Sequence, residues 1–69
     1  MNTTEVELLV RGVIAQLGLA VTVLSVIGSP AGWSIVARGG TGRVIRFTVA
    51  GGRPVAMRAA IQERLEAQH

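Results

Sequence analysis

Several residue types are absent or scarce in this chain of 69 residues, and each absence removes a class of function. There is no cysteine, which excludes disulfide bonds and thiolate metal sites and is typical of a cytoplasmic protein. The only histidine is the last residue, His69, so we expect no metal site and no cofactor. Aromatic residues make up 3% of the chain and tyrosine is absent, which removes the stacking platforms that bind single-stranded nucleic acids.

The residue sets of common enzymes are also missing. Proton transfer near neutral pH needs a group such as histidine, and His69 stands at the end of the chain. The sequence offers no combination of serine, histidine and acid, and a domain of this size rarely encloses a pocket. We therefore expect a single small domain, residues 1–69, that is not an enzyme and takes no small-molecule substrate.

Charges of opposite sign are segregated along the chain. All seven basic residues are arginine, and the four acids are glutamates near the two ends. Between Leu8 and Gln62 there is no acid. This acid-free stretch contains a block of five arginines: Arg38, Arg43, Arg46, Arg53 and Arg58. Such a block predicts a positive surface that attracts phosphate groups.

A long uncharged segment, Gly12 to Ala37, has the length of a membrane span. Glycine, serine and proline interrupt it, however, and Val21 to Ile27 is rich in β-branched residues, as strands are. The chain also opens with Glu5 and Glu7 where a signal peptide would be basic. We expect neither a membrane span nor a signal peptide.

Local patterns predict a helix followed by three strands. Thr4 and Glu7 have the spacing of a capping box, and apolar residues recur at helical spacing from Val6 to Leu17, with Gly18 as the end. The predicted strands are Leu19 to Ile27, Trp33 to Arg38 and Arg43 to Val49, and they are joined by the turns Gly28 to Gly32 and Gly39 to Gly42.

A second helix is predicted from Pro54 nearly to the chain end, with an apolar stripe of Met57, Ala60, Ile61 and Leu65. Alternation in the last strand directs Ile45, Phe47 and Val49 inward. The resulting α+β fold is α-β-β-β-α, a three-stranded antiparallel sheet with two helices packed on one face. Its other face carries Arg38 and Arg46.

This order of elements resembles the double-stranded RNA-binding domain. In that family a glycine-proline loop joins the first two strands, and the second helix begins with basic residues and an alanine-rich pattern. Here the loop is Gly28-Ser29-Pro30-Ala31-Gly32, and the helix reads Arg53-Pro54-Val55-Ala56-Met57-Arg58-Ala59-Ala60. The family's lysine pair at that helix is reduced to Arg53, with Arg58 further on. The resemblance implies binding to duplex RNA.

The same arrangement is similar to the HicA-type messenger-RNA interferase toxins. Those proteins carry a catalytic histidine in a Gly-Ser-His segment between the first strands. This chain has Gly28 and Ser29, followed by Pro30 in place of the histidine. The resemblance implies the shape of these toxins without their nuclease chemistry.

Two functions remain open. The first is a nucleic-acid-binding module in which Arg53 and Arg58 contact phosphates, Arg38, Arg43 and Arg46 extend the contact, and the loop carrying Ser29 enters a groove. The second is a protein-binding module, such as a phage or mobile-element inhibitor or a toxin-antitoxin component, acting through an exposed sheet or as a homodimer. It is suggested by a surplus of apolar strand residues, such as Val21, Val23, Val26 and Val36, over what one face of a small sheet can bury.

Overall fold

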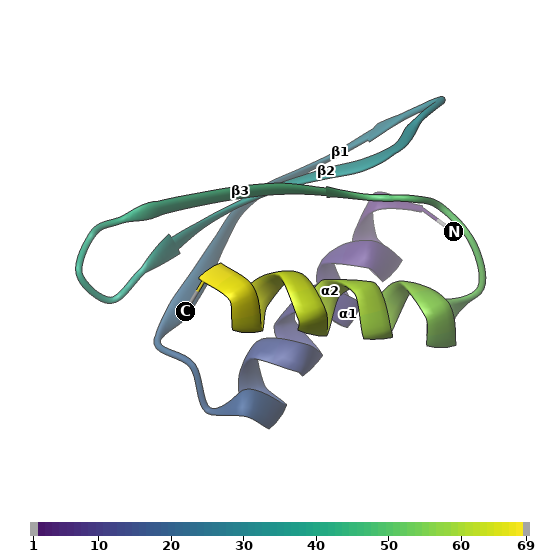
Figure 1. Cartoon of the computed structure of the whole chain (residues 1–69). Helices are drawn as coiled ribbons and strands as arrows, with labels where there is room; N and C mark the ends of the chain where they lie inside the picture. Colours follow the sequence, from purple (N-terminus) through teal and green to yellow (C-terminus); the bar gives the residue numbers. More distant parts are fainter. Residues whose placement is uncertain (1, 69) are drawn as a thin grey trace.

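The computed structural model describes residues 2–68, so His69 lies outside the described residues. It confirms the predicted α+β class and the order of elements, which are α1 (Thr3–Leu17), β1 (Val21–Ser29), β2 (Gly32–Gly39), β3 (Val44–Val49) and α2 (Pro54–Gln68). The strands form one antiparallel sheet in the order β1-β2-β3. Both helices lie below this sheet in the view of Figure 1. Neither helix of the described chain has the length and apolarity that a membrane crossing requires.

The helix ends follow from local chemistry, with one correction. The capping box of α1 is formed by Asn2 and Glu5 rather than by Thr4 and Glu7. The Glu5 N–H donates to Asn2 Oδ1 over 2.9 Å, and the Asn2 N–H donates to Glu5 Oε1 over 3.0 Å. Asparagine is among the best N-cap residues, which explains the earlier start. Gly18 ends α1 with φ of 68°, and Pro54 begins α2, both as predicted.

One cluster of apolar side chains holds the fold together. In the described residues the buried set contains no polar or charged residue. α1 packs against β1 and α2, and α2 also packs against β3. The buried positions from the helices and strands are Val6, Val10, Val13, Ile14, Val26, Ile35, Ala37, Ile45, Phe47, Val49, Met57, Ile61 and Leu65. Because this core lies on the helix side, the opposite face of the sheet is left open.

A β-bulge divides β1 into two halves. Val23 pairs with Ala37 and Ser25 pairs with Val36, so Leu24 has no partner in β2. The extra residue changes which side chains face the helices. Val21 and Val23, before the bulge, are half-buried against the core, and Val26, after it, is buried.

The predicted surplus of apolar residues on the strands is smaller than expected. Because of the bulge, three of the four valines named for it, Val21, Val23 and Val26, lie on the helix side of the sheet. Only Val36 stays on the open face, where it is half-buried. The exposed aliphatic residues of the sheet are instead Leu24, Ile27 and Val44, which are 46%, 60% and 49% exposed.

Two glycines at the end of the β1–β2 hairpin lie close to neighbouring atoms. At Gly28 a Cβ atom would lie 2.9 Å from the ring of Trp33, the residue opposite it in the sheet. At Gly32, with φ of 136°, a Cβ atom would lie 2.3 Å from the carbonyl oxygen of Val49. That distance is far below van der Waals contact with a backbone atom. Gly32 therefore lets the hairpin approach the end of β3.

We predict that Gly32→Ala lowers the free energy of unfolding by about 1–3 kcal/mol or more, since it combines backbone strain with a clash. Gly52→Ala is the matched control, because Gly52 has ordinary φ and no atom within 4 Å of a built Cβ. Urea denaturation followed by circular dichroism measures both variants. Equal stabilities for the two would contradict the close approach at Gly32.

Candidate nucleic-acid interface

The open face of the sheet is the surface that points away from the helices. Cross-strand pairing arranges it in three rows of three residues. These are Thr22, Arg38 and Val44, then Ser25, Val36 and Arg46, then Ile27, Ser34 and Thr48. The face is therefore built from arginines, hydroxyl residues and aliphatic residues, and it contains no acid.

Arg38 and Arg46 are neighbours on this open face. Arg38 pairs with Val44, and Arg46 stands two residues further along β3, which makes the two arginines a diagonal pair. Such neighbours have Cα atoms about 7–8 Å apart. Both side chains are exposed, and neither has a hydrogen bond or ion pair with another described residue. A shallow depression of about 360 Å³ borders Arg46 between β2 and β3.

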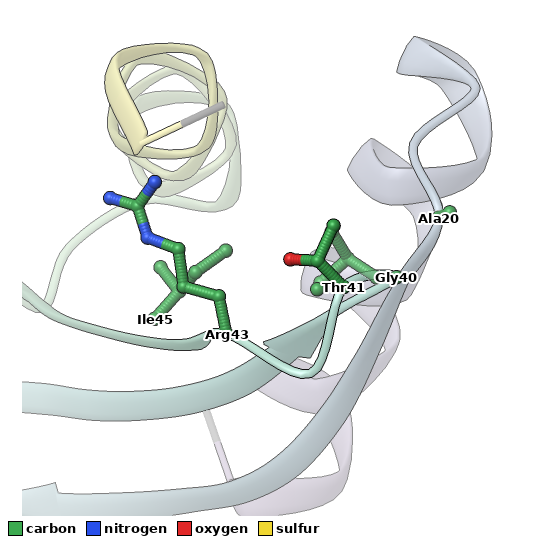
Figure 2. A pocket seen from close by; sticks show the side chains of 7 residues that line it. Ala20, Gly40, Thr41, Arg43 and Ile45 are labelled. Carbon is green, nitrogen blue, oxygen red and sulfur yellow. The ribbon is translucent and has the colours of Figure 1, made fainter.

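Arg43 lies in the turn between β2 and β3, at the same end of the sheet as Arg38. Its backbone carbonyl accepts a hydrogen bond of 2.7 Å from the Gly39 N–H. Its side chain extends toward the helix layer in Figure 2, on the side of the sheet that carries Ile45. Arg43 therefore lines a different surface, a hollow of about 350 Å³ that it shares with Thr41 and Ala20.

Arg58 has a contact within the protein. Its guanidinium donates a hydrogen bond to the side-chain Oε1 of Gln16, on the other helix. It passes over Gly12, where a Cβ atom would lie 3.6 Å from Nη1 of Arg58. The side chain is half-buried between the helices. The geometry thus makes Arg58 a link between α1 and α2.

Arg53 and Ser29 lie toward the other end of the sheet. Arg53 is exposed in the connection from β3 to α2, and its carbonyl accepts the first helical hydrogen bond, from Met57. Ser29 ends β1 and donates from its hydroxyl to the Gly32 carbonyl over 3.2 Å, inside the hairpin turn. In Figure 1 the two turns of the sheet point to opposite ends of the molecule. The five arginines and Ser29 are therefore spread over several surfaces.

The folded chain keeps the charge segregation of the sequence. All four glutamates lie on the helices, at Glu5, Glu7, Glu63 and Glu66, together with three arginines. The sheet, its turns and the β3–α2 connection hold four arginines and no acid. Among the described residues the only ion pair joins Arg11 and Glu7, 3.5 Å apart on α1. The strands, turns and β3–α2 connection are thus positive, and the helices are nearly neutral.

Aromatic side chains are not available on the open face. Phe47 is buried among the core residues, and Trp33 is half-buried on the helix side, packed near Gly28. A nucleobase therefore has no ring to stack on at this face. The chemistry that the face offers is charge from two guanidinium groups, hydrogen bonds from hydroxyl groups, and aliphatic contact.

The comparisons with known proteins give no relative for this chain: no protein-family model, no curated protein and no solved structure matches it. The site therefore has to be judged on its own geometry. Sequence reasoning did not find the Arg58–Gln16 contact. A glycine in the middle of a helix, here Gly12, is a signal for such a close approach from another element.

We predict that Arg58→Gln lowers the free energy of unfolding by about 1 kcal/mol, because the hydrogen bond to Gln16 and the packing over Gly12 are lost. Arg46→Gln removes the same charge from an exposed position and should change stability by less than about 0.5 kcal/mol. Thermal unfolding of both variants tests the difference. If Arg58→Gln were as stable as the wild type, the link between the helices would have no energetic importance.

Proposed function

We propose that this protein is a small, non-catalytic nucleic-acid-binding module whose open sheet face contacts the phosphate backbone of a duplex. The observation that carries the proposal is the diagonal pair Arg38 and Arg46 on an acid-free surface. Two guanidinium groups at this spacing can each bind phosphate oxygens with two parallel hydrogen bonds. The hydroxyl groups of Ser25, Ser34 and Thr48 lie on the same face and are further donors to phosphate.

A duplex is a better ligand than a single strand for this face. Single-strand binders hold bases by stacking them on aromatic rings, and Trp33 and Phe47 both lie on the helix side. Backbone recognition needs only charge and donors in a suitable shape. The order of elements that the chain shares with the double-stranded RNA-binding domain is consistent with RNA as the duplex.

Binding without catalysis fits the residues on this face. It carries arginine, serine, threonine and aliphatic side chains, and no histidine or carboxylate to serve as a general acid or base. Arg53, exposed before α2, extends the positive surface toward the other end of the sheet. Arg58 has a structural role in this proposal, because its side chain is engaged with Gln16.

The proposal predicts that the double variant Arg38→Gln and Arg46→Gln binds a duplex more weakly and with a smaller salt dependence. Each lost phosphate contact should reduce the slope of log affinity against log salt by about 0.9 on DNA. The control is Arg11→Gln with Arg64→Gln, which removes the same charge from the helices. Fluorescence anisotropy of labelled RNA duplex, DNA duplex and single strand across a salt series measures the effect.

The control variant decides how the result is read. If both double variants lost the same affinity, net charge alone would account for binding and the open face would not be the site. If the wild type did not bind any of the three nucleic acids at low salt, the proposal would be wrong.

A second candidate function, protein binding through the sheet, is favoured by one observation. Leu24, Ile27 and Val44 are exposed on the strands, where their side chains can contact a partner. A homodimer formed face to face would, however, bring Arg38 and Arg46 of one copy against those of the other with no acid between them. Like charges in such an interface are costly. The partner on this face would have to be acidic.

We therefore predict that the isolated protein sediments as a monomer of 7.2 kDa at micromolar concentration, at both low and high salt. High salt screens the charges of the arginines. Dimerisation that appears only at high salt would therefore indicate an aliphatic interface that charge repulsion prevents at low salt. Sedimentation velocity over a concentration series measures this. A stable dimer under all conditions would favour the protein-binding function, with Leu24→Ser and Ile27→Ser as the variants to locate the contact.

A further inference from the structure

A half-enclosed hollow lies between the β2–β3 turn and the start of β1. Its volume is about 350 Å³, and its walls are Ala20 and Val21 on one side and the turn residues on the other, with Ile45 from β3. Gly40 closely approaches the wall, since a Cβ atom built there would lie 3.2 Å from Cβ of Ala20. Figure 2 shows Thr41 and Arg43 projecting from either side of the turn.

Several donor groups of the residues that line this hollow are unpaired within residues 2–68. The Thr41 hydroxyl and the Arg43 guanidinium have no hydrogen-bond partner among residues 2–68. The backbone N–H groups of Gly40 and Thr41 likewise have no acceptor within those residues. By contrast, the flanking N–H groups are used, because Gly39 donates to Arg43 and Gly42 donates to Gly39. No acid lines the hollow.

A hairpin turn by itself needs only part of this arrangement. The two backbone bonds of Gly39 and Gly42, and the positive φ of 85° at Gly42, account for the reversal of the chain. They do not require an arginine beside Ala20 and Ile45 or a hydroxyl on the other side. Successive free N–H groups in a glycine turn form a concave binding site for anions, and a guanidinium group adds full charge.

We infer that this hollow binds the terminal phosphate monoester of a nucleic-acid strand, an inference that rests on the proposed function for the identity of the polymer. A monoester carries three acceptor oxygens and a charge of about −1.5 to −2, more than an internal phosphodiester. The guanidinium, the hydroxyl and the two backbone N–H groups can donate to those oxygens, and the guanidinium also balances their charge. A half-enclosed hollow admits the end of a strand more easily than its middle.

The position of the hollow fits a ligand on the open face. Arg38 directly precedes the turn and pairs with Val44, which directly follows Arg43. The diagonal arginine pair and the hollow therefore share one end of the sheet, on its two sides. A strand that lies over Arg46 and Arg38 and bends around the turn to the helix side brings its terminal phosphate to Thr41 and Arg43.

The first experiment titrates the full chain with inorganic phosphate and follows the backbone amide signals by NMR. We expect saturable shifts centred on Gly40 and Thr41 that chloride at equal ionic strength does not reproduce. Arg43→Gln should weaken phosphate binding by about tenfold, the loss expected for a charged hydrogen-bonding group. Thr41→Val should weaken it less, and Arg64→Gln, which removes the same charge from an exposed position on α2, should leave it unchanged. Unaltered signals in the core of each variant show that the fold is intact.

The second experiment compares duplexes that carry a phosphate or a hydroxyl at the 5′ end. Tighter binding of the phosphorylated duplex, lost in Arg43→Gln, supports the inference. Duplex binding that is equal for both ends, with no phosphate shifts at Gly40 and Thr41, overturns the inference while the proposed function stands. Phosphate shifts without any duplex binding overturn the assignment to a strand end and the proposed function together.

Discussion

Burial on one side of the sheet is the constraint on which the rest of this structure depends. A chain of 69 residues has two helices to cover three strands, and both contribute to one apolar cluster. No other helix or strand within residues 2–68 covers the opposite face of the sheet. The other face of the sheet must therefore face water or a partner. Residues on this face can carry charge because the core does not cover them, and Arg38 and Arg46 are two such residues.

The separation of charge follows from the same architecture. The acids lie on helices, where Glu5 serves in a capping box and Glu7 pairs with Arg11. The strands and turns carry arginine alone. If solubility were the only demand on the open face, both signs of charge would serve it, and mixed charges would repel each other less. An acid-free face costs some repulsion between Arg38 and Arg46, and a bound phosphate removes that repulsion. The absence of acids from this face therefore favours a ligand over a merely solvated surface.

Those parts of the fold that depend on short-range patterns could be predicted from the sequence. The period of two in β3 places Ile45, Phe47 and Val49 inward and Arg46 outward, as the structure has them. Gly18 and Pro54 mark helix ends because their backbone preferences are strong. The cap of α1 was misplaced because two overlapping residue pairs, Asn2 with Glu5 and Thr4 with Glu7, satisfy the same pattern.

Features that depend on contacts between distant residues could not be predicted. The engagement of Arg58 with Gln16 arises only when α2 crosses α1 above Gly12, so the block of five arginines is not one surface. The bulge at Leu24 could not be predicted either, because a run of valine and leucine residues can pair with a neighbouring strand in more than one register. Only the burial of Val21, Val23 and Val26 on one face shows which register is adopted.

The bulge at Leu24 determines which β1 residues enter the core and which lie on the open face. Without an extra residue, strict alternation would place Val26 on the face opposite to Val21 and Val23, and one part of the core would lose its β1 contribution. With it, both halves of β1 bury their valines, and Ser25 takes its place beside Val36 and Arg46 on the open face. Leu24 is left exposed as the consequence of this arrangement. Its exposure is thus explained by the register of β1, which weakens it as evidence for a protein interface and leaves the arginine pair as the more specific feature of the open face.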